Sequence, residues 1–273
     1  MKQKVALVLS SGGARGVAHI GVIEELLNQG YDITSISGTS MGALVGGMYA
    51  TGKIDIFKEW MCSLDKMDVF NLVDFTINTS GIVKGNKVIT EMKRMIPDIN
   101  IEDLNIPYSA VATDVLSEKE IVFSSGSLYE AIRASISIPS VFVPFKLNNW
   151  QLIDGGVLNP IPINRVERKQ DDILVVVDVN SRIPITVKKE TKEKTYSKSQ
   201  SKYIDTIYKK INHLIPKNHK DKVGYFNLLS KTSSLMLHKI SDLTLEQYHP
   251  DILINVSRKS FGTFDFYKSK ELI

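Results

Sequence analysis

The chain has 273 residues, of which 43% are hydrophobic and 23% charged, as in a globular protein with one large domain or a domain and an appendage. A single cysteine, Cys62, excludes an intrachain disulfide framework and favours a reducing compartment. No apolar run approaches the roughly 20 residues that span a bilayer, and residues 5–9 are too few for an export signal. We therefore expect a cytoplasmic protein that is able to bind peripherally at the inner face of the membrane.

The first part of the chain alternates predicted strands and helices. Residues 5–9 form a continuous apolar run, which is typical of a strand buried on both faces. Apolar residues then recur at helical spacing up to Gly30, a favoured helix C-cap. Residues 33–37 predict a second strand, and residues 41–51 a helix that is apolar almost all round and hence buried. This alternation favours a parallel sheet in an α/β fold.

Further elements follow along the chain. Strands are predicted over residues 108–115, 120–123, 173–179 and 252–256, helices over 128–135 and 225–238, and a hairpin from 143–147 and 151–153.

Charge is distributed unevenly along the chain, whose formal net charge is +4. From Arg182 to Lys222 there are twelve Lys or Arg against four Asp or Glu, a local balance of +8. Residues 182–222 are therefore predicted to be a lid or a site of contact with anionic membrane, with a solvated linker as the alternative. No nucleic-acid-binding motif accompanies the basic residues, so no nucleic-acid partner is expected.

The strongest chemical signal is Gly38-Thr39-Ser40-Met41-Gly42, a G-x-S-x-G between a predicted strand and a predicted helix. A serine on such a sharp turn has strained backbone angles, and the flanking glycines, Gly38 and Gly42, leave room for the turn. The turn presents the hydroxyl at the carboxyl end of the sheet, beside a helix N-terminus that favours negative charge. Ser40 is therefore the candidate nucleophile.

A serine nucleophile needs a base, and the usual base is histidine. None of the five histidines lies in a suitable context: His19 falls on the first predicted helix, and none of the late four follows a strong strand in a Gly- or Pro-framed loop. Asp154 is the better candidate, because it follows a predicted strand and precedes Gly155 and Gly156, which allow a tight turn.

A second glycine-rich loop, Ser11-Gly12-Gly13-Ala14-Arg15-Gly16, lies between the first predicted strand and helix. Its backbone N–H groups are suited to binding an anion. The dinucleotide fingerprint G-x-G-x-x-G is not met, and no acidic residue stands where a ribose would need one. An oxyanion hole explains this loop and the serine motif together.

These motifs in their order, S-G-G-A-R-G, G-T-S-M-G and D-G-G, resemble the patatin-like phospholipase family and its bacterial members in particular. Blocks at residues 112–114, 134–144 and 154–162 are also similar, and the resemblance covers about residues 4–180. Beyond them it is faint, with one match near residues 261–266.

The resemblance implies a three-layer α/β/α fold with a central, mostly parallel sheet, and a serine acyl hydrolase that acts on lipid esters through a Ser40–Asp154 dyad. Backbone amides of Gly12, Gly13 and Ala14 would stabilise the oxyanion. Arg15 would hold the loop in shape, next to Gly16. No metal or other cofactor is implied. Ser11 replaces the family's first glycine and would weaken the oxyanion hole if that position required a positive φ.

Three domains of the chain are predicted: a catalytic core over residues 1–180, a basic insertion or lid over 181–222, and a C-terminal segment over 223–273 that returns to the core. Two alternatives to a hydrolase stay open. One is an acyltransferase or thioesterase with the same dyad, and the other is a non-catalytic regulatory protein that keeps the fold. The sequence gives no indication of oligomeric state.

Overall fold

The computed structural model describes residues 2–78, 81–185 and 225–273. Within these ranges eight strands form one mixed sheet in the order β10-β9-β1-β2-β5-β8-β7, with β6 paired to β5. The five strands from β10 to β5 are mutually parallel, whereas β6, β7 and β8 are antiparallel to their neighbours. The strands are β1 (Lys4–Leu9), β2 (Asp32–Thr39), β5 (Tyr108–Asp114), β6 (Lys119–Phe123), β7 (Phe145–Leu147), β8 (Trp150–Asp154), β9 (Asp172–Ser181) and β10 (Ile252–Ser257).

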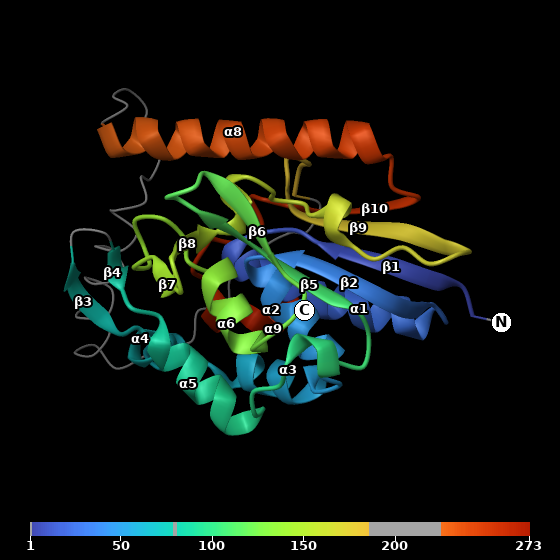
Figure 1. Cartoon of the computed structure of the whole chain (residues 1–273), viewed down its shortest axis with the longest axis horizontal. Coiled ribbons are helices and arrows are strands. Elements are labelled where there is room, and N and C mark those ends of the chain that lie inside the picture. Colours follow the sequence, from blue (N-terminus) through green and yellow to red (C-terminus); the bar gives the residue numbers. More distant parts are fainter. Residues whose placement is uncertain (1, 79–80, 186–224) are drawn as a thin grey trace.

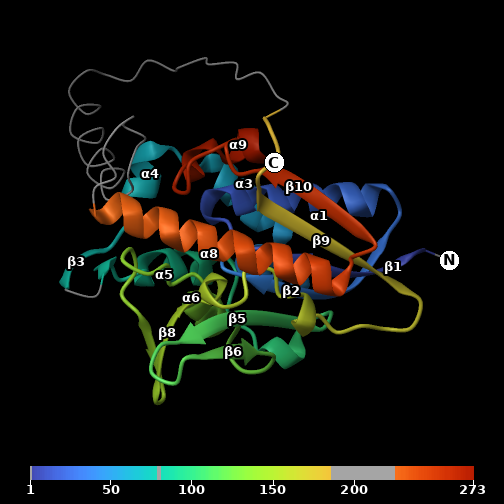
Figure 2. The same ribbon diagram turned by 90° about the horizontal axis from the view of Figure 1, so that it is seen from above.

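Helices cover both faces of this sheet, which confirms the predicted three-layer α/β architecture (Figures 1 and 2). Most of them lie on one face, while α8 crosses the other (Figure 1). A separate two-stranded ribbon, β3 (Phe75–Asn78) and β4 (Gly81–Val83), lies near α4 and α5. The helices are α1 (Ala18–Asn28), α2 (Met41–Ala50), α3 (Ile54–Ser63), α4 (Lys66–Asn71), α5 (Asn86–Met95), α6 (Leu128–Ser135), α8 (Tyr225–Tyr248) and α9 (Ser269–Leu272).

The first strand shows why the sheet is buried on both sides. Val5, Leu7 and Leu9 pack into the main core with α1 and α2, whereas Ala6 and Val8 join a smaller cluster on the opposite face. That cluster includes residues of the 161–166 segment, and Leu245 of α8 packs against it. A continuous apolar run is the pattern expected of a strand that is covered on both faces.

Helix α2 lies in the interior, as its sequence predicts. Every residue from Met41 to Ala50 except Tyr49 is buried. The helix contacts β1, β2 and β5 as well as α1, α3 and α6. Since α2 begins directly after Ser40, its burial fixes the position of the turn that carries this residue.

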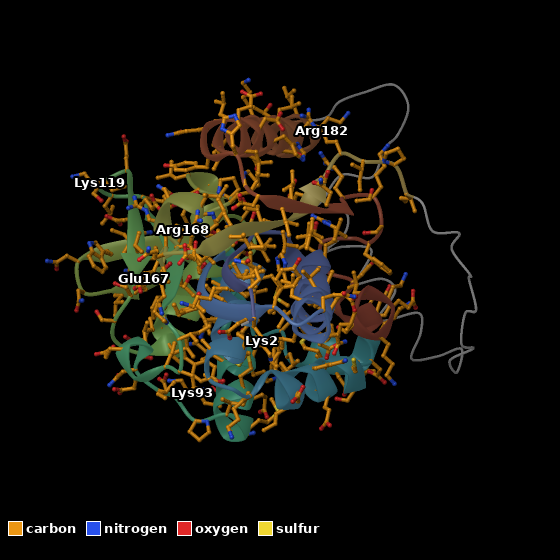
Figure 3. All side chains as sticks on the ribbon, turned by 90° about the vertical axis from the view of Figure 1, so that its right-hand side faces the viewer. Lys2, Lys93, Lys119, Glu167, Arg168 and Arg182 are labelled. Carbon is orange, nitrogen blue, oxygen red and sulfur yellow. The ribbon has the colours of Figure 1, made fainter. Side chains whose placement is uncertain are left out.

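Two parts of the chain differ from the sequence-based expectations. The late helix is longer than predicted, since α8 continues beyond His238 to Tyr248. It is attached to the sheet partly through an ion pair of 2.6 Å between Arg182, labelled in Figure 3, and Asp242. The second difference is the 54–95 region, for which no elements were predicted and which forms α3, α4, β3, β4 and α5.

The predicted division into core, insertion and C-terminal segment stays a prediction. Residues 186–224, most of the predicted insertion, lie outside the described residues. After them, β10 pairs in parallel with β9 at the edge of the main sheet. The 261–266 segment then contacts the loop between β1 and α1, because Thr263 accepts a hydrogen bond from the Ala14 amide.

Candidate active site

Ser40 occupies a strained turn between β2 and α2. Its φ of 57° and ψ of −123° place a residue with a Cβ in a region that such residues rarely adopt, and the side chain is buried. The flanking glycines are required by close backbone contacts. A Cβ at Gly38 would lie 2.4 Å from the carbonyl oxygen of Gly42, and a Cβ at Gly42 would lie 2.2 Å from that of Leu9. This is the geometry of a nucleophile elbow.

A residue that the sequence did not single out holds this turn in place. Ser135, the last residue of α6, accepts a hydrogen bond of 2.7 Å from the Ser40 amide. Its own hydroxyl donates to the carbonyl oxygen of Val111 at 2.6 Å. Ser135 therefore connects the strained turn to β5, and it engages the Ser40 amide so that this N–H is not available to a ligand.

Asp154 lies near Ser40 because β8 and β2 pair with the same edge of β5. Strand β6 covers one edge of β5 along residues 110–114, so β2 and β8 must both use the other edge. There β2 ends with Thr39 opposite Val111, and β8 pairs next, with Asp154 opposite Ala112. Along this edge of β5, Asp154 of β8 therefore lies next after Thr39 of β2, beside the turn that carries Ser40.

The two side chains act on each other. The Ser40 hydroxyl, as a hydrogen-bond donor, lowers the pKa of the Asp154 carboxyl, and the Gly156 amide donates to Asp154 Oδ1 at 2.7 Å. Burial raises the pKa of Asp154 to about 6, because desolvation of the carboxylate outweighs these two hydrogen bonds. A carboxylate with such a pKa is ionised at neutral pH and is still basic enough to accept a proton.

The loop between β1 and α1 carries free backbone donors at Gly12 and Gly13. Neither amide has a hydrogen-bond acceptor among the described residues. Gly13 has a φ of +57°, and a Cβ there would lie 2.6 Å from the Thr263 carbonyl oxygen. Gly13 also borders the same cavity as Ser40. Two amides in this position are suited to hydrogen-bond an oxyanion on a Ser40 adduct.

The Ala14 amide, expected to help stabilise an oxyanion, has a partner within the protein. It donates to the Thr263 carbonyl oxygen at 2.8 Å. The partner lies far along the chain, in a segment that only a faint sequence match indicated. By contrast, Ser11 is not among the residues with positive φ, so serine at this position imposes no backbone strain.

Arg15 ties the loop to two distant segments. Its guanidinium donates to the carbonyl oxygens of Val179 and Phe261, and to Asn180 Oδ1 at 2.7 Å. Burial lowers the pKa of Arg15 to about 10, so it remains a cation at neutral pH. Gly16 allows close packing on α2, because a Cβ there would lie 2.5 Å from the Cβ of Met41.

No described histidine hydrogen-bonds to Ser40 or Asp154. His19 is fully buried, its Nε2 lies 2.9 Å from the carbonyl oxygen of Ser10, and burial lowers its pKa to about 4. It is therefore neutral and donates to this carbonyl. His238 lies against Arg258, and His249 follows the end of α8. His213 and His219 lie outside the described residues.

An apolar cavity of about 170 Å³ opens beside Ser40. Besides Ser40 and two glycines, its lining residues are aliphatic, aromatic or methionine. They come from α2, from α3 and α4 and the residues that follow each, from β4 and α5, from the 136–142 segment and from Phe264 and Phe266. None of the residues from α3, α4 and α5 was identified from the sequence. A hydroxyl beside such a cavity suits a ligand that carries a hydrocarbon chain next to its reactive group.

The described part of the chain holds no cluster of three or more His, Cys, Asp or Glu side chains that could bind a metal ion. In the same ranges, none of the helices has the length and apolar character needed to cross a membrane.

Comparison with known proteins identifies the class to which this fold and site belong. The family model described as patatin-like phospholipase matches residues 7–166. This match spans more than half of the chain, and the chain therefore belongs to the patatin-like phospholipase family.

Particular relatives are similar to about two-thirds of the chain. An uncharacterized NTE family protein of Mycobacterium bovis is 45% identical over 177 residues, which make up 65% of this chain and 49% of that protein. Lysophospholipase NTE1 of Kluyveromyces lactis is 34% identical over 187 residues, 66% of this chain and 13% of that protein. The chain thus matches about half, or less, of the length of these relatives. Among solved structures, VipD from Legionella pneumophila has a TM-score of 0.44 at 14% identity, covering 99% of this chain and 66% of VipD.

Proposed function

We propose that the chain is a serine acyl hydrolase of lipid esters, with Ser40 as nucleophile and Asp154 as its base. The observation that carries this proposal is the position of Ser40, which lies on a strained turn beside an apolar cavity and whose hydroxyl lowers the pKa of the buried Asp154 carboxyl. Family membership and the similarity to a lysophospholipase support the same reaction and a lipid substrate.

In the first half of the proposed reaction, Ser40 Oγ attacks the carbonyl carbon of the ester and Asp154 accepts its proton. The carbonyl oxygen becomes an oxyanion, which the Gly12 and Gly13 amides stabilise, and the N-terminus of α2 adds a favourable dipole. The intermediate then collapses to an ester on Ser40, and the leaving alcohol takes the proton from Asp154. In the second half, Asp154 accepts a proton from water, the water oxygen attacks the acyl carbon, and Ser40 leaves with that proton.

The cavity suggests how the substrate is held. A fatty acyl chain would lie among the side chains of α3, α4 and α5, with its ester carbon at Ser40. Burial of each methylene contributes roughly 0.8 kcal/mol of favourable transfer free energy. This contribution favours long acyl chains over short ones.

Labelling with a fluorophosphonate probe, which forms a covalent adduct with activated serine hydroxyls, tests the proposed nucleophile. Mass spectrometry of the digested protein should locate the adduct on Ser40 and on no other serine. Heat-unfolded protein is the control, because it has the same serines without the Asp154 contact. A folded protein that stays unlabelled, or that is labelled elsewhere, would contradict the proposal.

Filling the cavity is expected to change chain-length preference. Val88 lines the cavity from α5 and is half-buried. The Val88→Trp variant should lower kcat/KM for a dodecanoyl nitrophenyl ester by about ten-fold or more and leave the acetyl ester little changed, because only the long chain needs the lost volume. Leu27→Trp, at an exposed position on α1, is the matched control. An equal loss on both esters would show that this cavity does not bind the acyl chain.

Contact with anionic membrane through residues 182–222 stays a prediction from the sequence, as does a cytoplasmic location. Most of that segment lies outside the described residues, and its basic composition alone supports the proposed contact.

A further inference from the structure

Asn180, the last residue but one of β9, has a buried side-chain amide to which the proposed reaction has given no role. Both ends of this amide are hydrogen-bonded to the segment between β1 and α1. Its Oδ1 accepts from Arg15 Nη2 at 2.7 Å, and its Nδ2 donates to the Ser11 carbonyl oxygen at 2.6 Å. A guanidinium only donates, so the oxygen of the amide must face Arg15 and the nitrogen must face Ser11.

The carbonyl group that Asn180 contacts belongs to the same peptide plane as the Gly12 amide. No peptide bond of the described residues is cis, so the C=O and N–H of this plane point in opposite directions. The hydrogen bond holds the Ser11 carbonyl oxygen towards Asn180 and thereby directs the Gly12 N–H to the other side. Within residues 2–78, 81–185 and 225–273 that N–H has no hydrogen-bond acceptor.

The residues on either side of Gly12 contact the candidate active site. A Cβ at Gly156 would lie 3.2 Å from Ser11 Cβ and 3.0 Å from Asp154 Oδ1, so Ser11 packs against the turn that follows the proposed base. On the other side, Gly13 borders the apolar cavity together with the proposed nucleophile. The unpaired Gly12 amide therefore lies along the chain between these two contacts.

The Ser11–Gly12 peptide needs a restraint, because glycine permits backbone angles that other residues avoid. Half a turn of this peptide plane would place the carbonyl oxygen where the N–H was. A donor to the oxyanion would then be replaced by an acceptor that repels it. The Asn180 bond opposes this change, since the turned peptide would leave the buried Nδ2 without its acceptor. The Ser10 hydroxyl donates to the same carbonyl oxygen, but over a longer 3.2 Å.

We propose that Asn180 is a positioning residue for the oxyanion hole, an inference that rests on the proposed function. Asn180 holds the Ser11–Gly12 peptide with its N–H directed at the oxyanion, and Arg15 acts through Asn180 by fixing the orientation of its amide. This contribution arises only once the carbonyl oxygen has gained negative charge, that is, in the transition states. Loss of the Asn180 bond should therefore lower kcat and leave KM little changed.

The first variant is Asn180→Asp, which keeps an acceptor for Arg15 but has no hydrogen to donate to the Ser11 carbonyl oxygen. Its kcat for a nitrophenyl butyrate should fall by about 10- to 100-fold with KM little changed. Outright loss of one oxyanion donor costs about 10²- to 10³-fold, and a misdirected peptide still presents its N–H part of the time.

The corresponding thionoester, in which sulfur replaces the carbonyl oxygen, separates the oxyanion hole from other effects. Sulfur is a weak hydrogen-bond acceptor, so the Gly12 amide contributes little to the thionoester reaction. The ratio of kcat/KM for the ester to kcat/KM for the thionoester should therefore fall about ten-fold or more in Asn180→Asp. The added negative charge of aspartate would slow both substrates alike and would not change this ratio.

Two further variants complete the experiment. Asn180→Ala removes the donor without adding charge, should lower the ratio in the same way, and serves if the aspartate variant does not fold. Asn164→Asp is the matched control. It makes the same chemical change at an exposed asparagine, whose Oδ1 accepts from Asn159 Nδ2, and it should leave kcat and the ratio unchanged.

Two outcomes would overturn the inference and leave the proposed reaction intact. One is a folded Asn180 variant with the kcat and ratio of the wild type. The other is an equal loss on ester and thionoester, which would show that Asn180 does not act through an oxyanion donor. Failure of the proposed function looks different, because the wild type would then hydrolyse neither substrate in a Ser40-dependent manner.

Discussion

Replacing Ser40 by alanine is expected to lower kcat/KM for ester hydrolysis by about 10⁴-fold or more, because the acyl-enzyme can no longer form. The residual rate would come from the Gly12 and Gly13 amides and from binding in the cavity, neither of which involves the hydroxyl. Alanine keeps the Cβ and therefore the backbone strain at a φ of 57°, so the melting temperature should change little.

The measurement compares hydrolysis of a nitrophenyl ester and of a lysophospholipid by the wild type and the variant, with circular dichroism to verify folding. Ser109→Ala is a matched control, since Ser109 is a buried serine on β5 that bonds to Ser37 and to the Arg165 carbonyl oxygen. It should keep its activity even if its stability falls. A folded Ser40→Ala variant with wild-type activity would remove the proposed mechanism and favour a non-catalytic regulatory role.

The strands of the sheet could be predicted because each is recognisable from the apolar pattern of its own short segment. The run at residues 5–9 is continuously apolar, and the run at 173–179 is apolar except for Asp178, since both faces of each strand are covered. The same holds for α2, whose apolar surface all round reflects burial on every side. In these segments the apolar character of the local sequence matches the burial of the same residues in the structure.

The 54–95 region could not be predicted in the same way. Its helices are short and lie over the cavity, so few of their residues are buried: Phe57 and Met61 in α3, and Ile89 and Met92 in α5. Helix α8 was predicted too short for a related reason. Beyond its predicted end at His238 it exposes Leu243, which obscures the periodic pattern of a helix with one buried face.

The candidate site shows the same division between local and long-range information. The strained turn at Ser40 is a local feature, and its motif identifies it. That Asp154 lies beside it depends on β8 pairing with β5 just beyond the end of β2, which no local pattern reveals. The engagement of the Ala14 amide by Thr263 likewise depends on a contact between opposite ends of the chain.

Replacing Asp154 by asparagine is expected to abolish most of the activity and to stabilise the fold. Asparagine cannot accept the proton of Ser40, so kcat/KM should fall by about 10²- to 10⁴-fold, the usual contribution of a general base. At the same time the variant no longer buries an ionised carboxylate. The folded pKa of about 6, against 3.8 for an exposed aspartate, means that the unfolded state ionises first as the pH rises.

The sign of the stability effect follows from that order. Between pH 3.8 and about 6 the folded state binds more protons at Asp154 than the unfolded state, so the stabilisation from this group is lost as the pH rises and is gone above about 6. A difference of about two pKa units corresponds to about 3 kcal/mol at neutral pH. The Asp154→Asn variant should therefore melt several degrees above the wild type at pH 8, and the two should converge at pH 4.

The activity of the wild type should have the opposite dependence on pH. Only the ionised carboxylate acts as a base, so kcat/KM should rise with pH up to about 6 and then level off. Melting temperatures and ester hydrolysis measured from pH 4 to 8 on both proteins test the two dependences together. If Asp154→Asn is less stable than the wild type at pH 8, or if wild-type activity is constant from pH 4 to 8, burial does not control the ionisation of Asp154. If both expectations hold, the same buried carboxylate that makes Ser40 reactive lowers the stability of the fold at the pH at which it works.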